Sequence, residues 1–126
     1  MLMSSPQSSR GVQLSNTVWV WHKASTLSLT QLGYFVAVAE AGSVSRAAKR
    51  LHVSQPPLSR QIRALEEELR TPLFIRRSRG VHLSPDGELF LEHAREILGA
   101  ISRAERAMAG ARDVQLNAQR DAQRAR

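Results

Sequence analysis

The segment from Ser43 to Leu69, SVSRAAKRLHVSQPPLSRQIRALEEEL, constrains the fold more than any other part of the chain. It predicts two helices joined by a very short turn, the second opening with the adjacent prolines Pro56 and Pro57. With Ser54 as N-cap, both prolines fall where a backbone N–H has no acceptor within the helix, so they remove no hydrogen bond. The pair gives the helix a rigid start and leaves its positive dipole end facing outward. A stop signal for the preceding helix would explain one proline better than two.

Apolar residues at helical spacing place further helices around this segment. A first helix begins near Leu29, and Gly42 suits the left-handed position after its end. A short helix follows from about Val44 to Leu51. After the prolines, apolar positions separated by four, three and four residues form one buried stripe (Leu58, Ile62, Leu65 and Leu69). On the surface of that helix, Glu66 and Arg70 are expected to form a favourable pair.

The segment TPLFIRRSRGVHLS predicts a two-stranded hairpin. Its strands are expected at Leu73–Ile75 and Val81–Leu83, with Gly80 in the tight turn between them. The intervening RRSRG gives the hairpin a basic tip. A hairpin of this kind beside a helix-turn-helix unit is a wing.

A long helix is predicted after the hairpin, because Ser84 can cap it and Pro85 suits its first position. We expect it to span residues 85–112, with a frayed or disordered end over 113–126. Leu89 and Phe90 are expected to lie partly on the domain itself. The apolar positions alternate spacings of four and three, which predicts a helix–helix seam that a partner helix covers (Phe90, Ala94, Ile97, Ile101, Ala104 and Met108).

The charge distribution favours a polyanionic partner. The formal net charge is +7 and the pI is about 11.4. Between residues 43 and 79, nine basic residues face three acids, a local balance of +6. Because a basic cluster is often only a solvated surface, the case for nucleic acid depends on geometry.

The order of elements predicts a mainly α fold: a winged helix-turn-helix over residues 27–84, made of three helices and a two-stranded wing, followed by the long helix. The recognition helix would span Gln55 to Leu69, with its N-terminal turn at base edges in the major groove. A Gln side chain can form two hydrogen bonds with adenine, and an Arg side chain can form two with guanine. The rings of the two prolines can contact thymine methyl groups. Arg79 is expected in the minor groove, and Arg76, Arg77 and Ser45 at phosphates. The full set of expected DNA contacts is Ser45, Ser54, Gln55, Pro56, Pro57, Ser59, Arg60, Arg63, Arg76, Arg77 and Arg79.

From about Leu29 to Ala107 the chain resembles the amino-terminal DNA-binding domain of a LysR-type transcriptional regulator. The run SQPPLSRQIRALEEEL, followed by PLF, a basic wing and LSPDGE, carries the resemblance. It implies a homodimer formed through the linker helix, with higher oligomers possible for a full-length protein, that binds an interrupted palindrome in double-stranded DNA. By position, it also implies groove or phosphate contacts for Gln55, Pro56, Ser59 and Arg60, and a wing contact for Arg79.

Three departures accompany this resemblance. Residues 1–26 form an extension that is expected to be disordered. Gly33 stands where the family often has a basic residue. The effector domain of the family is missing, so the chain is expected to be a fragment or a truncated product, with no small-molecule site.

Other functions fit the sequence less well. The four histidines (His22, His52, His82 and His93) lack metal-ligand spacing, and there is no phosphate-binding loop, so we expect neither an enzyme nor a cofactor. The sequence predicts no exposed aromatic surface on which RNA bases could stack, so RNA binding is a less favoured function. No segment predicts a signal peptide or a membrane span, which favours a cytoplasmic, nucleoid-associated protein. The remaining alternative is a short interaction module that heterodimerises with a full-length regulator and antagonises it.

Overall fold

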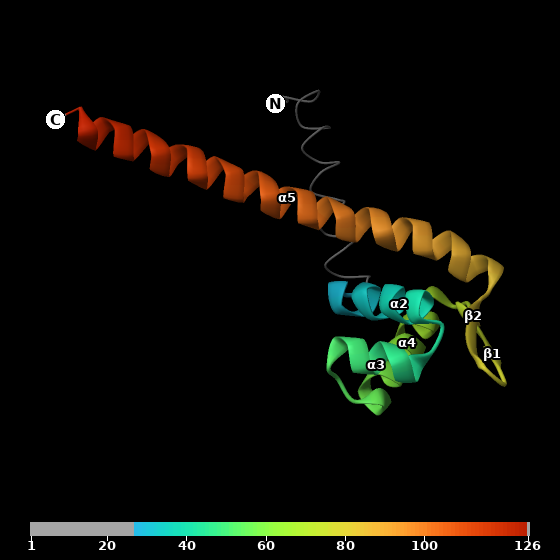
Figure 1. Ribbon diagram of the computed structural model, residues 1–126. Helices are drawn as coiled ribbons and strands as arrows, with labels where there is room; N and C mark the ends of the chain where they lie inside the picture. Colours follow the sequence, from blue (N-terminus) through green and yellow to red (C-terminus); the bar gives the residue numbers. More distant parts are fainter. Residues whose placement is uncertain (1–26, 126) are drawn as a thin grey trace, which may run out of the picture.

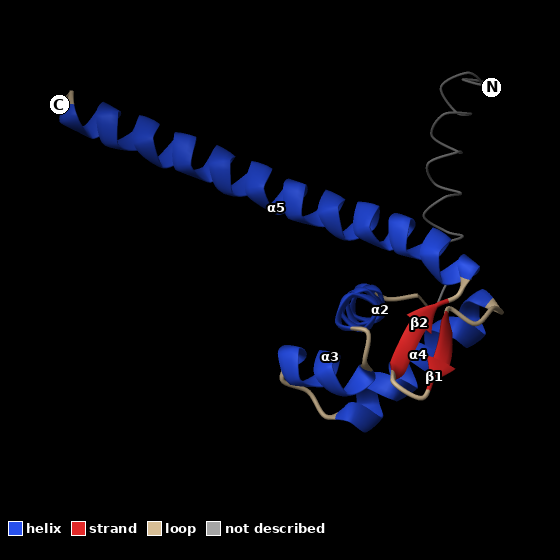
Figure 2. Cartoon of the chain, turned by 45° about the vertical axis from the view of Figure 1, so that its right-hand side comes forward, coloured by secondary structure: helices blue, strands red, loops and turns tan. Residues whose placement is uncertain are grey.

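The computed structural model describes residues 27–125, so the predicted extension over residues 1–26 lies outside the described part. Three helices form the body of the domain: α2 (Leu29–Ala41), α3 (Val44–Leu51) and α4 (Gln55–Leu69). The wing and the long helix follow: β1 (Phe74–Arg77), β2 (Gly80–Leu83) and α5 (Pro85–Arg124). In Figure 1, α5 crosses over α2 and extends well beyond the other described elements. Figure 2 shows α2 nearly end-on, with the two strands beside it and α4 behind the wing. The mainly α winged helix-turn-helix architecture is therefore confirmed.

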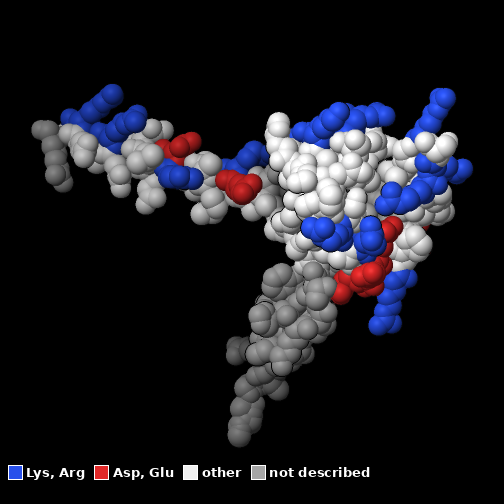
Figure 3. All heavy atoms as spheres, turned by 90° about the horizontal axis from the view of Figure 1, so that it is seen from below, with Lys and Arg blue, Asp and Glu red and all other residues white. Residues whose placement is uncertain are grey.

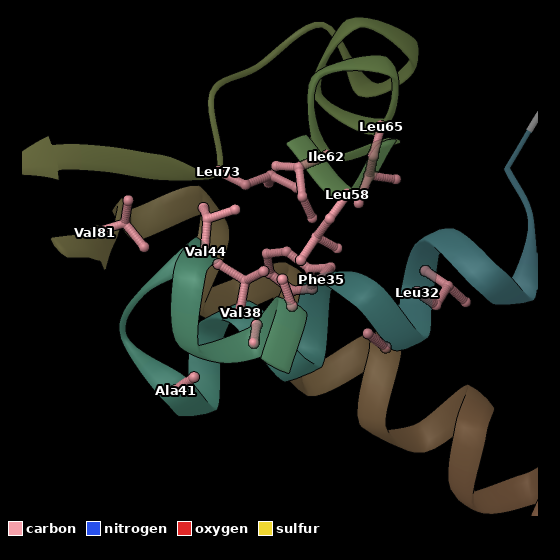
Figure 4. Packing of buried hydrophobic residues seen from close by; sticks show 13 residues of the cluster. Leu32, Phe35, Val38, Ala41, Val44, Leu58, Ile62, Leu65, Leu73 and Val81 are labelled. Carbon is pink, nitrogen blue, oxygen red and sulfur yellow. The ribbon is translucent and has the colours of Figure 1, made fainter. Parts of the chain in front are cut away.

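The core joins all of these elements around one aromatic side chain, Phe35 of α2, which is fully buried. The centroid of its ring lies 5.3 Å from that of Phe74 in β1 and 5.3 Å from that of Phe90 in α5. Aromatic pairs at this separation contribute beyond the area they bury. Figure 4 shows the leucines of α4 converging on Phe35. The buried apolar side chains are Leu32, Phe35, Val38, Ala41, Val44, Ala47, Ala48, Leu58, Ile62, Leu65, Leu73, Val81 and Ala94.

Local capping fixes the ends of the first two helices. Ser28 and Gln31 form a reciprocal capping box at the start of α2. Gly42 ends that helix in the left-handed conformation, with φ of 68°. The Ser43 hydroxyl accepts the Arg46 N–H at 3.2 Å and starts α3 immediately afterwards. His52 ends α3, also with positive φ, so that the turn into α4 is only a few residues long. These caps produce the tight helix-turn-helix that the sequence predicted.

The first strand of the wing begins and ends later in the chain than the sequence predicted, over Phe74–Arg77 instead of Leu73–Ile75. Phe74 pairs with Leu83, and Arg77 pairs with Gly80 in an antiparallel ladder. Leu73 stands before the strand, because its side chain is buried in the core and its N–H is bonded to a side chain of α4. Arg76 and Arg77 consequently belong to the ladder, and the tip between the strands is shorter than the predicted RRSRG loop.

Helix α5 begins as predicted and ends later than predicted. The Ser84 hydroxyl accepts the Gly87 N–H at 2.9 Å, and Pro85 occupies the first position of the helix. The helix then continues to Arg124, whereas the sequence predicted a helix over residues 85–112 followed by a frayed or disordered end over 113–126. The physical reason is local: after Gly110 no glycine or proline interrupts a segment rich in Ala, Gln and Arg, which favour helix. The apolar seam ends at Met108, but an apolar seam is needed only for pairing with another helix. Its absence beyond Met108 therefore does not interrupt the helical backbone.

The first turns of α5, called its root below, pack on the chain's own domain. Part of the apolar seam that was predicted to contact a partner helix is therefore covered within the same chain. Ala94 has no exposed surface, and Phe90 is half-buried against Phe35, so the prediction of a partner contact is wrong for Ala94. The reason is that α5 crosses α2 here, and a methyl side chain lets the two helices approach closely. An ion pair between Arg95 and Glu40, 3.2 Å apart, lies on the surface of the same crossing. Leu89, expected on the domain, is instead 57% exposed.

Candidate nucleic-acid interface

The N-terminal turn of α4 has the exposure that the sequence predicted for a recognition helix. Gln55, Pro56 and Pro57 are all exposed at the start of the helix. Ser54 is the N-cap residue, but its side chain makes no capping hydrogen bond. The reason is that an N-cap oxygen accepts from the second or third residue of the helix, and both of these are prolines without an N–H. The Ser54 hydroxyl therefore remains available to another group.

Burial of one side of α4 fixes which side chains face outward. Leu58 and Leu65 are fully buried and Ile62 is 5% exposed, so this stripe anchors the helix on α2 and α3. Arg60 and Arg63 lie on the exposed surface of the helix, and Ser59 is half-buried at its margin. Of the remaining predicted contacts, Ser45 is exposed in the first turn of α3.

The wing presents its three arginines in different ways. Arg79 lies at the tip and is exposed, as predicted. Arg76 and Arg77 are also exposed, but they are consecutive residues of a strand, so their side chains point to opposite faces of the ribbon. Arg76 lies opposite Val81, which is buried, whereas Arg77 shares its face with the exposed Ile75. The two side chains therefore occupy different surroundings, which the sequence alone did not indicate.

Positive charge dominates the side of the domain formed by α3, α4 and the wing. Figure 3 shows Lys and Arg side chains in several places on this face, whereas acidic side chains of the domain gather in one area. The helix before the turn, α3, adds cations that were not among the predicted DNA contacts. They are the exposed residues Arg46, Lys49 and Arg50 of α3.

Shallow hollows lie on the surface of the described residues. One of them, about 280 Å³, lies where the end of α4, the segment before β1 and the first turns of α5 meet. Its lining is mainly apolar and includes Leu69, Leu73 and Phe90. Residues 27–125 hold no group of three or more His, Cys, Asp or Glu that could bind a metal ion. Among the same residues, no helix has the length and apolarity needed to cross a membrane.

Residues 29–88 match the family model described as bacterial regulatory helix-turn-helix protein, lysR family. One similar protein is the HTH-type transcriptional regulator TfdT of Cupriavidus pinatubonensis, 51% identical over 80 residues, which make up 64% of this chain and 35% of that protein. The HTH-type transcriptional regulator BudR of Klebsiella aerogenes is 57% identical over 72 residues, 57% of this chain and 50% of that protein. The chain thus spans half or less of the length of these curated relatives.

Solved structures show the same similarity in three dimensions. The crystal structure of the CbnR_DBD–DNA complex is 51% identical with a TM-score of 0.63, and the match covers 68% of this chain and 99% of that one. The BenM_DBD/catB site 1 DNA complex is 45% identical with a TM-score of 0.60, covering 62% of this chain and 88% of that one. With the capped turn, the exposed recognition helix and the wing described above, these matches show that the chain belongs to the LysR family of bacterial regulatory helix-turn-helix proteins, with residues 29–88 as its helix-turn-helix domain.

Proposed function

We propose that this chain binds double-stranded DNA in a sequence-specific manner, as the DNA-binding part of a transcription regulator. The exposed first turn of α4, held from behind by Leu58 and Ile62, is the observation that carries the proposal. A helix that enters the major groove needs its N-terminal residues at base edges and its opposite side fixed on the domain. The two similar structures named above are complexes with DNA, which supports this assignment.

Each exposed group is assigned by its chemistry. Gln55 can bond an adenine through two hydrogen bonds, and Arg60 or Arg63 can bond guanine in the same manner. The rings of Pro56 and Pro57 can contact thymine methyl groups. Arg79 at the wing tip enters the adjacent minor groove, which is most negative where it is narrow. The hydroxyls of Ser45, Ser54 and Ser59 bind phosphate or base edges, and so set the register of the helix on the duplex.

The assembly that we propose is a homodimer formed through α5. A helix of 40 residues is about 60 Å long, and only its first turns pack on the domain. Ile97 is 42% exposed and Met108 is 67% exposed, so the apolar stripe continues beyond any cover from the described residues. The stripe that pairs with a second copy therefore comprises Ile97, Ile101, Ala104 and Met108. Two recognition helices held this way fit an interrupted palindrome, with half-sites one or more helical turns apart.

The base-reading role of α4 is tested by Arg60→Ala. We expect the loss of a bidentate contact to cost about 1–3 kcal/mol at one base position and to relax the preference there. A binding-site selection on the purified chain first defines the preferred duplex, and titrations against that duplex and its single-base variants then measure the change. Arg106→Ala, the same change on the exposed surface of α5, is the matched control. Unchanged affinity and unchanged base preference for Arg60→Ala would remove Arg60 from the groove.

The phosphate role of Arg76 and Arg77 gives a different expected result. Replacing both with alanine should weaken binding to all duplexes alike and reduce the slope of log K against log[salt] by about 0.9 for each lost phosphate contact. Because the two side chains point to opposite faces of the ribbon, the single variants identify which of them contacts phosphate. The measurement is affinity over a range of salt concentrations, and a slope equal to that of the wild type in the double variant would contradict the assignment.

A further inference from the structure

Glu66 connects the recognition helix to the wing. One carboxylate oxygen, Oε2, accepts the backbone N–H of Leu73 at 2.7 Å and that of Phe74 at 3.2 Å. The sequence predicted that Glu66 would pair with Arg70 instead. Arg70 occupies the left-handed cap position after α4, with φ of 58°, and Glu66 faces the root of β1. Hydrogen bonds to an ionised acceptor are shorter and stronger than those between neutral groups.

The second strand of the wing is fixed from the other side of the domain. The Val81 N–H donates to the Gly42 carbonyl oxygen at 3.1 Å, at the end of α2. Gly80 approaches the same carbonyl so closely that a Cβ at residue 80 would overlap the Gly42 oxygen. Near the base of the hairpin, the Ser84 N–H donates to the Leu73 carbonyl oxygen at 2.9 Å. β2 is therefore attached to α2, whereas Glu66 attaches the root of β1 to α4.

We infer that Glu66 is a positioning residue, which sets where the wing tip lies relative to the exposed turn of α4. This inference rests on the proposed function, because it requires Arg79 of the wing and Arg60 of α4 to grip the same duplex. Both groups reach DNA at once only if their separation is fixed. Loss of the Glu66 acceptor would let the root of β1 shift and would displace Arg79, while Arg60 keeps its place on the buried stripe of α4.

The test begins with Glu66→Ala, which removes the acceptor, and Glu67→Ala, a neighbouring exposed acid of the same helix. Both variants remove one negative charge near the basic surface, which by itself favours DNA binding. We expect Glu67→Ala to bind the preferred duplex as tightly as the wild type or slightly more tightly. Glu66→Ala is expected to bind about tenfold more weakly, the opposite sign, because groups that act together show coupling of this size.

A double-mutant cycle with Arg79 separates positioning from a general loss of stability. If Glu66 acts through the wing tip, its replacement should cost less than about twofold once Arg79→Ala has removed that contact. In the Arg60→Ala background the cost should remain about tenfold. A full tenfold loss in the Arg79→Ala background would overturn the inference. If the wild-type chain prefers no duplex at all, the proposed function itself fails, and the two failures are thus distinguishable.

Two further measurements strengthen the test, and the first of them remains available if Glu66→Ala folds poorly. Glu66→Gln keeps an acceptor oxygen at nearly the same place, so it should recover most of the affinity, and its residual loss should also disappear with Arg79→Ala. Hydrogen exchange tests the two hydrogen bonds to Glu66 without DNA: the amides of Leu73 and Phe74 should exchange faster in Glu66→Ala and at the wild-type rate in Glu67→Ala. Equal exchange rates of these two amides in the wild type, Glu66→Ala and Glu67→Ala would contradict the role of Glu66 in holding the start of β1.

Discussion

Replacing Gly87 with alanine is expected to destabilise the domain by about 3 kcal/mol, although alanine normally favours helix. A Cβ at residue 87 would overlap the carbonyl oxygen of Leu73 and would lie 3.0 Å from Cδ2 of Leu83. The Leu73 oxygen is backbone and accepts the Ser84 N–H, so it has little freedom to move. The overlap must be relieved by shifting the start of α5 away from the base of the wing.

Gly33→Ala is the matched control for this prediction, because it is the same substitution within a helix. A Cβ at residue 33 would meet nothing within 4 Å. It should therefore stabilise the protein by about 1 kcal/mol, the ordinary difference in helix propensity. Urea unfolding of the three proteins, followed by circular dichroism, measures both changes. Equal stabilisation by the two alanines would contradict the close approach of Gly87 to Leu73.

The second large effect is expected for Ile101→Asp, which places a charge in the apolar stripe of α5. An uncompensated charge buried between two helices should cost about 3 kcal/mol or more, which raises the dissociation constant of the proposed dimer at least about a hundredfold. Each dimer carries the change twice. Sedimentation at several protein concentrations should show a dimer for the wild type and a monomer for the variant.

Ser102→Asp serves as its control, because it adds the same charge one residue further along the exposed surface of α5. We expect this variant to remain dimeric. Loss of tight DNA binding should accompany loss of the dimer in Ile101→Asp, since a single recognition helix can occupy only one half-site. An intact dimer for Ile101→Asp would reject pairing through this stripe.

Periodicity and helix-start signals predicted the fold well where they reflect local physics. The stripe of Leu58, Ile62 and Leu65 is buried, and Ser84 caps α5 as expected. The predictions were wrong where contacts distant in sequence decide the outcome. Heptad spacing treats every apolar position of a helix alike, so it could not distinguish Ala94, which packs on α2, from Ile97, which remains exposed.

The sequence predicted which residues of the candidate site are exposed better than it predicted the hydrogen bonds that hold the site in place. The exposed residues of α4 and the wing arginines follow from the order of elements and the positions of the cations. Glu66 was assigned a local partner, because spacing along a helix indicates neighbours on the helix and says nothing of backbone N–H groups that fold back against it. The Ser54 hydroxyl was expected to act as a cap, although the prolines that follow it remove the donors it would need.

Helix α5 is attached to the domain only through its first turns, so a small rotation there produces a large displacement at its far end. Its first turn is held by the Ser84 cap, by the close approach of Gly87 to Leu73, and by a hydrogen bond of 2.7 Å between the Thr71 hydroxyl and Asp86. A tilt of about 5° at that root would move the far end of a rod about 60 Å long by about 5 Å. Conversely, a displacement of the far end of α5 would be transmitted along the rod to the base of the wing.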